Sequence, residues 1–332
     1  MSRALSLARA SRNNREPVGV LEAFGLRPLR PALAQAARAL GGDPNMPATR
    51  FGLSSTRVFK PRIAIPTWLG LRPRDGRLWI YNLFNHDAPP PTERYSVRVT
   101  RCRDFQGGQF TYDAHRGVDI AAPVGTFVST PAPGVVRSVV CDMDRGGLKV
   151  AIDHGSGLFT TLNHLSRALV RPGARVGRGD VVALSGSSGM ELVLFFPWVA
   201  PHVHFNVLLD GQRVDPFAHA GLCSLWRSGD NQPLPHRGEP GETHGFVESD
   251  YDEQGVEAAI ADCKDDDEAC RLAAIPDLET RAAEVMMSYM FRGPLYSRAP
   301  RVYARAYERR AVLDLPFRAA DVSGVILPEA TR

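Results

Sequence analysis

Lysine is scarce in this 332-residue chain, in which only three of the 40 basic residues are lysine. The 36 acidic residues nearly balance the basic ones and leave a net charge of +4, which does not favour nucleic acid as a partner. Long apolar runs are also absent. The longest, Leu192–Ala200, has nine residues and contains Pro197, far short of the roughly 20 residues of a membrane span. We therefore expect no integral membrane segment.

Cysteine is rare as well. The five cysteines are scattered and form no CxxC pair, which excludes a disulfide scaffold and a thiolate zinc site. Cys263 and Cys270 flank an acidic run, and the sequence leaves open whether they form a local disulfide or remain two free thiols. Residues 1–16 lack the apolar stretch of about 7–15 residues of a standard signal peptide.

Short β-like runs dominate the middle of the chain and are separated by turns rich in Gly, Pro and Asp. They are Thr126–Ser129, Gly134–Val140, Lys149–Ile152, Leu158–Asn163, Val181–Ser185 and Val203–Leu209. Many short strands between turns predict a mainly β protein, with an antiparallel sheet or sandwich as its core.

Shifts in composition divide the chain into five predicted parts. In order, they are a partly disordered N-terminal arm (1–55), a β-rich flank packing on the core (56–109), the catalytic core (110–220), a linker (221–249) and an α/β C-terminal extension (250–332). We expect a short helix at Leu33–Leu40, strands at 78–81 and 95–99, and helices at Glu253–Ala274 and Leu278–Phe291. The tail from Arg301 returns to β-like alternation.

Two groups of histidines stand out in the β-rich part. The first is His115 with Asp119 in HRGVD, and the second is His202 with His204 in PHVHF. In a strand, side chains alternate between faces, so His202, His204 and Asn206 would share one face. Two imidazoles and a carboxylate with an open fourth position form a catalytic zinc arrangement, although an HxH pair on an apolar strand also occurs without metal. The other ungrouped histidines predict no catalytic site: 86, 154, 219, 236 and 244.

Five blocks in a fixed order extend this pattern. They are HRGVDIAAPVGTFVSTPAPGVV (115–136), IDHGSGLFTTLNHLS (152–166), PGARVGRGDVVALSGSSG (172–189), PHVHFNV (201–207) and DGQRVDP (210–216). Together they resemble the lysostaphin/LytM-type zinc endopeptidases of bacterial cell walls. The resemblance covers about 100 residues and none of the flanks.

The resemblance implies a role for each matching position. His115, Asp119 and His204 would be the ligands of one Zn²⁺ per chain, and His164 and His202 would lie beside the metal as catalytic residues. Zinc with three protein ligands lowers the pKa of its bound water toward about 7. No HExxH helix is present to supply a glutamate base, so the two catalytic histidines would orient the water and move the proton.

Three departures from the family pattern stand out. Leu162 occupies a position that usually carries a tyrosine, and Asn206 one that often carries a glutamate. The segment 191–200 is longer and more apolar than expected at that point. It is either a loop packed against the flanks or a hydrophobic wall over the cleft, and a protein partner at 192–200 is a further interpretation.

The sequence thus predicts a zinc-dependent endopeptidase that hydrolyses peptide bonds in the stem peptides or cross-links of peptidoglycan. Two alternatives remain open. One is a catalytically weak or inactive module of the same fold that binds the cell wall, and the other is an intracellular zinc peptidase with a different substrate. The resemblance implies an extracytoplasmic location, in the periplasm or cell envelope, although no signal peptide is seen.

Overall fold

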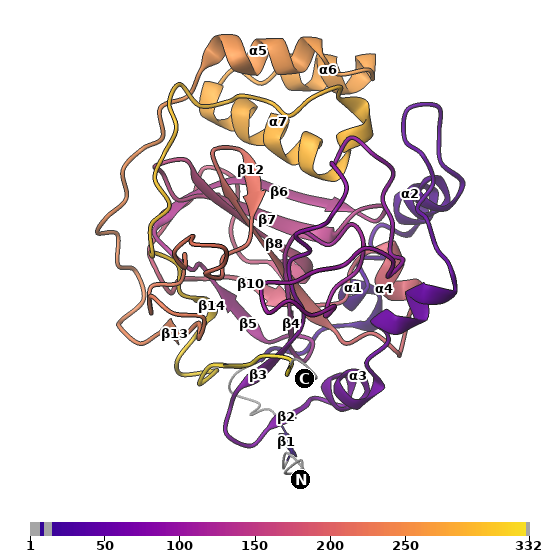
Figure 1. Cartoon of the computed structure of the whole chain (residues 1–332), viewed down its shortest axis with the longest axis vertical. Coiled ribbons are helices and arrows are strands. Elements are labelled where there is room, and N and C mark those ends of the chain that lie inside the picture. Colours follow the sequence, from indigo (N-terminus) through magenta and orange to yellow (C-terminus); the bar gives the residue numbers. More distant parts are fainter. Residues whose placement is uncertain (1–6, 10–14, 330–332) are drawn as a thin grey trace.

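A large twisted sheet forms the centre of the molecule (Figure 1). The structure is a computed structural model and describes residues 7–9 and 15–329. The strands of this sheet are β3 (Leu78–Asn82), β4 (Val118–Ala121), β5 (Phe127–Ser129), β6 (Gly134–Asp142), β7 (Gly147–Asp153), β8 (Leu158–Ala168), β9 (Arg175–Val176), β10 (Val181–Ser185), β11 (His202–Leu209), β12 (Gln212–Val214) and β15 (Val325–Ile326). Their main order is β15-β3-β4-β11-β8-β7-β6-β9, with β10 pairing β5 and β8, and β12 pairing β11.

Antiparallel pairing prevails in this sheet, and only β15 runs parallel to its neighbour β3. Two small sheets pair β1 (Leu7–Arg9) with β2 (Leu71–Pro73), and β13 (Pro235–His236) with β14 (Leu315–Arg318). Each of the six strands predicted between residues 126 and 209 corresponds to an observed strand. The prediction of a mainly β fold is therefore confirmed.

The strand predicted at 95–99 is wrong. Ser96 makes only an isolated bridge to Arg50. The carboxylate of Asp113 accepts hydrogen bonds from the backbone N–H groups of Thr100 and Arg101 at 2.8 and 3.1 Å. Within the run itself, the N–H groups of Arg98 and Val99 donate to the hydroxyls of Ser96 and Ser54 at 3.3 and 3.2 Å. Side chains thus satisfy backbone donors that a strand ladder would otherwise pair.

Three helices cover one face of the sheet (Figure 1): α5 (Glu253–Ala261), α6 (Asp266–Ala273) and α7 (Leu278–Phe291). Ala151, Phe159 and Leu208 of the sheet share a core with apolar side chains of these helices. The opposite face has its own buried core, which includes Val150 and Phe205. The central strands are buried on both faces, so their sequences show little polar alternation.

The helical composition predicted over Glu253–Ala274 is confirmed, and the chain there forms two helices, α5 and α6. Asp265 caps the second helix, and its carboxylate accepts a hydrogen bond from Glu268 N at 3.0 Å. Cys263 and Cys270 are both free thiols, so the disulfide alternative is not realised. The β-like alternation predicted from Arg301 yields no strand before β14, only an isolated bridge between Tyr251 and Tyr303.

The N-terminal part is more helical than predicted. It contains α1 (Val20–Ala23), α2 (Leu29–Gly41), the 3₁₀ helix η2 (Leu53–Val58) and α3 (Pro61–Trp68), and further along the chain lie α4 (Met190–Leu194) and the 3₁₀ helix η3 (Gly293–Leu295). The helix predicted at Leu33–Leu40 lies within α2. Residues 1–6 and 10–14, which bear on the predicted disorder and the missing signal peptide, lie outside the described residues. The five part boundaries stay predictions.

None of the helices in the described residues combines the length and apolar character needed to cross a membrane.

Candidate metal centre and active site

Three strands bring the two histidine groups together. Strand β11 lies between β4 and β8, and in the β4 pairing His204 is directly opposite Asp119. In the β8 pairing His204 is opposite Asn163, and His164, the next residue of β8, has a left-handed backbone with a φ of 61°. Directly opposed residues of antiparallel strands point to the same face. The pairing register thus joins residues that are far apart in the sequence.

The candidate ligand atoms of His115, Asp119 and His204 converge on one point. His115 Nε2 lies 3.1 Å from Asp119 Oδ1 and 3.1 Å from His204 Nδ1, and His204 Nδ1 lies 2.7 Å from Asp119 Oδ1. Zinc binds imidazole nitrogen and carboxylate oxygen at about 2.0–2.2 Å. Three atoms about 3 Å from one another, all from imidazole or carboxylate groups, fit one such ion.

Each of the three candidate ligands also makes a hydrogen bond to a residue outside the ligand group. His115 Nδ1 donates a hydrogen bond to Leu83 O at 2.7 Å, and His204 Nε2 donates to Asn206 Oδ1 at 3.0 Å. Asn82 Nδ2 donates to Asp119 Oδ2 at 2.8 Å. Such outer partners fix the tautomer and orientation of metal ligands. The asparagine that departs from the family pattern at position 206 therefore has a defined role in holding His204.

The protonation states of this group suit a metal. Burial opposes ionisation of Asp119, but the positive potential of His115, His202 and His204 outweighs it and holds the pKa of Asp119 well below its usual range. Burial lowers the pKa of His202 and of His204. Metal ligands must be deprotonated, and these two directions, a lowered pKa for Asp119 and a lowered pKa for His204, both favour the deprotonated ligand.

Gly117 of the HRGVD block has no room for a side chain. A Cβ atom there would lie 2.6 Å from His204 Nε2 and 2.8 Å from Phe205 O. The glycine is required because the backbone of this block passes directly against the His204 ring.

The two predicted catalytic histidines flank the candidate ligands. His164 and His202 have ring centroids 4.7 Å apart. His164 Nδ1 donates to Ser188 O at 2.7 Å, and His202 Nδ1 lies 2.8 Å from Ala200 O and 2.7 Å from the Tyr81 hydroxyl. Burial, aided by the nearby His202, lowers the pKa of His164 to about 3. The structure thus brings all five predicted site residues together, and each of them is buried.

The segment 191–200 forms a wall of this site. Leu192, Phe195 and Val199 line a cavity of about 30 Å³ together with His202 and Asp119. Leu192 and Val199 also belong to a buried cluster with the N-terminal flank, against which Phe195 packs. Four side chains remain exposed: Val193, Leu194, Phe196 and Trp198. The segment is therefore both a packed loop and a wall, and a partner at 192–200 stays a prediction.

Three polar residues of the site were missed by sequence reasoning because no local motif marks them. Glu191 Oε1 lies 4.0 Å from His164 Nε2. Tyr95 and Tyr112, joined by a 3.0 Å hydrogen bond between their hydroxyls, line a pocket with His164 and His204. Tyrosine side chains from the flank are thus present beside the site even though position 162 is a leucine.

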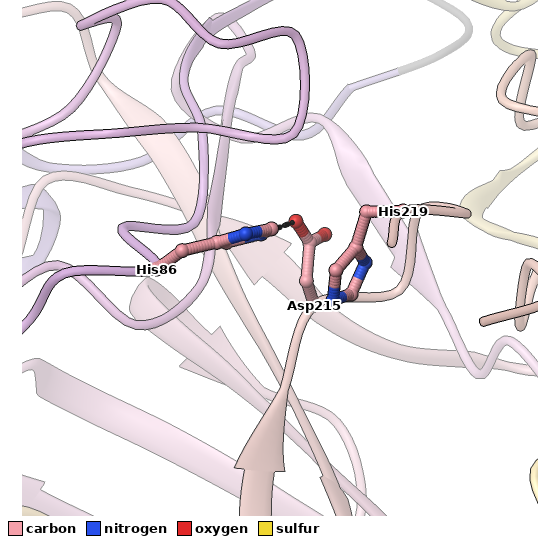
Figure 2. A group of neighbouring side chains, drawn as sticks. All are labelled: His86, Asp215 and His219. Carbon is pink, nitrogen blue, oxygen red and sulfur yellow. Dashed lines mark hydrogen bonds and ion pairs between the residues drawn. The ribbon is translucent and has the colours of Figure 1, made fainter. Parts of the chain in front are cut away.

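Among the described residues, a second group also has the composition of a metal site. It consists of His86, Asp215 and His219, and Figure 2 shows the Asp215 carboxylate between the two imidazole rings. His86 and His219 form no group in the sequence, and only the fold brings them together.

Comparisons with known proteins concern only the predicted core region, residues 110–220. Residues 113–216 match the model of peptidase family M23. Two similar proteins are an uncharacterized metalloprotease of Haemophilus influenzae, 35% identical over 102 residues, and the peptidoglycan DD-endopeptidase ShyA of Vibrio cholerae, 36% identical over 101 residues. The matches cover 31% and 30% of this chain but only 20% and 22% of those proteins. The chain thus spans about a fifth of the length of either relative.

A solved structure is also similar to part of this chain. A mutant catalytic domain of the prophage-encoded M23 protein EnpA from Enterococcus faecalis is 32% identical, and the match covers 33% of this chain and 81% of that domain with a TM-score of 0.29. The matching residues include every one of the candidate ligands and both candidate catalytic histidines. Residues 113–216 of this chain therefore belong to peptidase family M23.

Proposed function

We propose that this protein is a zinc-dependent endopeptidase that hydrolyses peptide bonds in the stem peptides or cross-links of peptidoglycan. The observation that carries the proposal is the convergence of His115 Nε2, Asp119 Oδ1 and His204 Nδ1, each backed by its own hydrogen-bond partner. Two of the relatives, a metalloprotease and a peptidoglycan DD-endopeptidase, support the same activity. They also support an extracytoplasmic location.

His115, Asp119 and His204 would hold the zinc ion. When bound, zinc supplies two kinds of chemistry, because it acidifies water toward a pKa of about 7 and polarises a carbonyl group. The chain itself fixes the three side chains through Leu83 O, Asn82 and Asn206, so that they are ordered before the ion arrives.

His164 and His202 would carry the proton. The Nδ1–H of His164 is held by the carbonyl of Ser188, which leaves Nε2 with its lone pair. His202 has its Nδ1 at the Ala200 carbonyl and its Nε2 3.5 Å from Asp119 Oδ1. Their Nε2 atoms would orient the attacking water, and the pair would pass a proton to the leaving amine.

The experiment measures zinc content and muropeptide release from purified peptidoglycan for the wild type, His164→Ala and His202→Ala. His244→Ala, which removes an exposed histidine, is the matched control. We expect both catalytic variants to keep the zinc and to release muropeptides about 10²- to 10⁴-fold more slowly, which is the usual contribution of a general acid–base group. The control should match the wild type.

The other outcomes separate the alternatives. Wild-type rates in both catalytic variants would contradict the assigned roles. A zinc-loaded wild type that binds peptidoglycan and releases nothing would be an inactive cell-wall-binding module. Hydrolysis of unfolded proteins without release from peptidoglycan would make the protein a peptidase with another substrate.

A further inference from the structure

A groove leads from the candidate active site to the surface. Its inner pocket, of about 40 Å³, is lined by His164, His204 and Glu191, and its outer pocket, of about 30 Å³, by Pro89 to Pro91. The two pockets share the side chains of Tyr95, Ala114, Arg116, Arg145, Arg213, Met290 and Phe291. They are therefore two parts of one groove, built by the core, the N-terminal flank and helix α7.

Three arginines of this groove are held by oxygens of the protein. Arg116 donates to the carbonyls of Ala88 and Pro89 at 2.8 Å each, and Arg213 donates to the carbonyl of Met290. Arg145 donates to the Thr49 hydroxyl at 2.8 Å and to the carbonyl of Asp144 at 3.0 Å, and its guanidinium lies 4.6 Å from the centre of the Tyr95 ring. These anchors fix the three side chains without neutralising their charge.

These arginines form no ion pair within 4.0 Å with a carboxylate of the described residues, although Glu191 lines the inner pocket and Glu93 the outer one. Burial lowers the pKa of Arg213 to about 10, and the neighbouring Arg116 adds to the effect. Buried charges are costly unless they are paired, so three guanidinium groups at one groove indicate an anionic ligand.

We propose that Arg116, Arg145 and Arg213 bind a free carboxylate of the substrate peptide and so select anionic stem peptides. The guanidinium fork matches a carboxylate with two parallel hydrogen bonds, which neutral amides of the same shape cannot equal. The three arginines lie beside His164 and His204. The bound carboxylate would therefore belong to the same peptide that is cleaved. The proposal rests on the proposed endopeptidase function.

The test compares a cross-linked muropeptide that has free carboxylates with the same compound after conversion of its carboxylates to amides. Binding of each to the zinc-free protein is measured by calorimetry, and hydrolysis of each by the zinc-loaded protein is measured as kcat and KM. The variants are Arg213→Gln and Arg145→Gln, with Arg171→Gln, an exposed arginine outside the groove, as the matched control.

We expect amidation to weaken binding and raise KM about 10- to 100-fold in the wild type and the control, with kcat little changed, since a charge-assisted hydrogen bond contributes about 1.5–3 kcal/mol. In Arg213→Gln and Arg145→Gln the two compounds should become nearly equal. Equal binding and equal KM in the wild type would overturn the carboxylate site while leaving the endopeptidase function intact. Selective binding without hydrolysis would refute the function and keep the site, and the absence of both would refute both.

A second observation, independent of the groove, concerns His86, Asp215 and His219 (Figure 2). His86 Nε2 lies 2.7 Å from Asp215 Oδ2, and the two imidazole rings are 4.3 Å apart at their centroids. His219 Nδ1 donates to Phe217 O at 2.8 Å, which leaves its Nε2 lone pair free. Asp215 Oδ1 accepts from Phe217 N at 3.0 Å. The group thus has the donor types of a zinc site and outer hydrogen bonds of the kind that orient metal ligands.

We infer that His86, Asp215 and His219 bind a second divalent cation of the zinc type, separate from the candidate catalytic centre. The ion would tie the segment after β3 to the loop after β12. The same β3 segment contains Asn82 and Leu83, which hold Asp119 and His115.

Zinc per chain is measured for the wild type, His219→Ala, His86→Gln and His244→Ala after dialysis against limiting free zinc. We expect His219→Ala and His86→Gln each to lose one equivalent relative to the wild type and to His244→Ala, and the double variant His204→Ala/His219→Ala to lose two relative to the wild type. Wild-type zinc content in His219→Ala and in His86→Gln would overturn the second site, and the 2.7 Å contact would then be an ion pair only.

Discussion

Asn82→Ala removes one buried amide that touches the candidate metal centre without belonging to it. The Asn82 side chain donates to Asp119 Oδ2 at 2.8 Å, while Asp119 Oδ1 faces His115 and His204. In the variant the buried carboxylate loses its fixed donor and is free to rotate. Removing such a partner typically weakens metal binding about 10- to 100-fold. This corresponds to about 1.4–2.7 kcal/mol of metal-binding free energy.

The assay is a zinc titration against a chelator of known affinity, with the free energy of unfolding of the zinc-free protein measured in parallel. Thr130→Val is the matched control, because it removes another buried donor, the hydroxyl that bonds Ala132 O at 2.6 Å, outside the candidate site. The control should lose about 1 kcal/mol of stability and none of the zinc affinity. Equal zinc affinity in Asn82→Ala and the wild type would refute the reasoning that the β3 segment orients the metal ligands.

Two further predictions concern steric fit and pH. Gly117→Ala should displace the His204 ring, because the new Cβ would lie 2.6 Å from His204 Nε2, and zinc affinity should fall, whereas Gly41→Ala, which has open space, should leave it unchanged in the same titration. Burial lowers the pKa of His154 to about 4 in the folded chain. In the unfolded chain the same imidazole binds a proton near pH 6.5, so between these two pH values only the unfolded state is protonated at His154. The folded state should therefore lose about 3 kcal/mol between pH 7 and 4 through this residue. Denaturant unfolding of His154→Gln should show a shallower decline than the wild type, and parallel declines would contradict the assignment.

Local motifs made the inner site predictable. His115 and Asp119 lie in one short block, and the alternation of a strand places His202 and His204 on one face. The resemblance then assigned roles that agree with the geometry, since His164 lies within the same cluster of rings.

The surroundings of the site were not predictable, because distant pairings supply them. Asn82 reaches Asp119 only because β3 pairs with β4, and no pattern around Asn82 marks it. The same holds for Arg213, which lies in β12, and Arg145, which lies between β6 and β7, and the two meet at the groove. Propensity alone does not reveal such contacts, since they depend on which strands become neighbours.

Side chains that compete with regular structure explain the errors in the predicted elements. The run at 95–99 has strand composition, but serine hydroxyls satisfy backbone donors within it, and the carboxylate of Asp113 satisfies those that follow it. The acidic run after Cys263 has helical composition, yet Asp265 acts as a cap and starts a new helix. Both carboxylates act on backbone N–H groups, and a window of average propensity does not represent that effect.

The most direct test of the endopeptidase account is zinc content together with muropeptide release for the wild type and His204→Ala, in protein purified without added metal. The account predicts that the wild type binds zinc and releases muropeptides, and that His204→Ala loses one zinc equivalent and its release activity together. Muropeptide release by His204→Ala at the wild-type rate, or a wild type that holds no zinc, would contradict it.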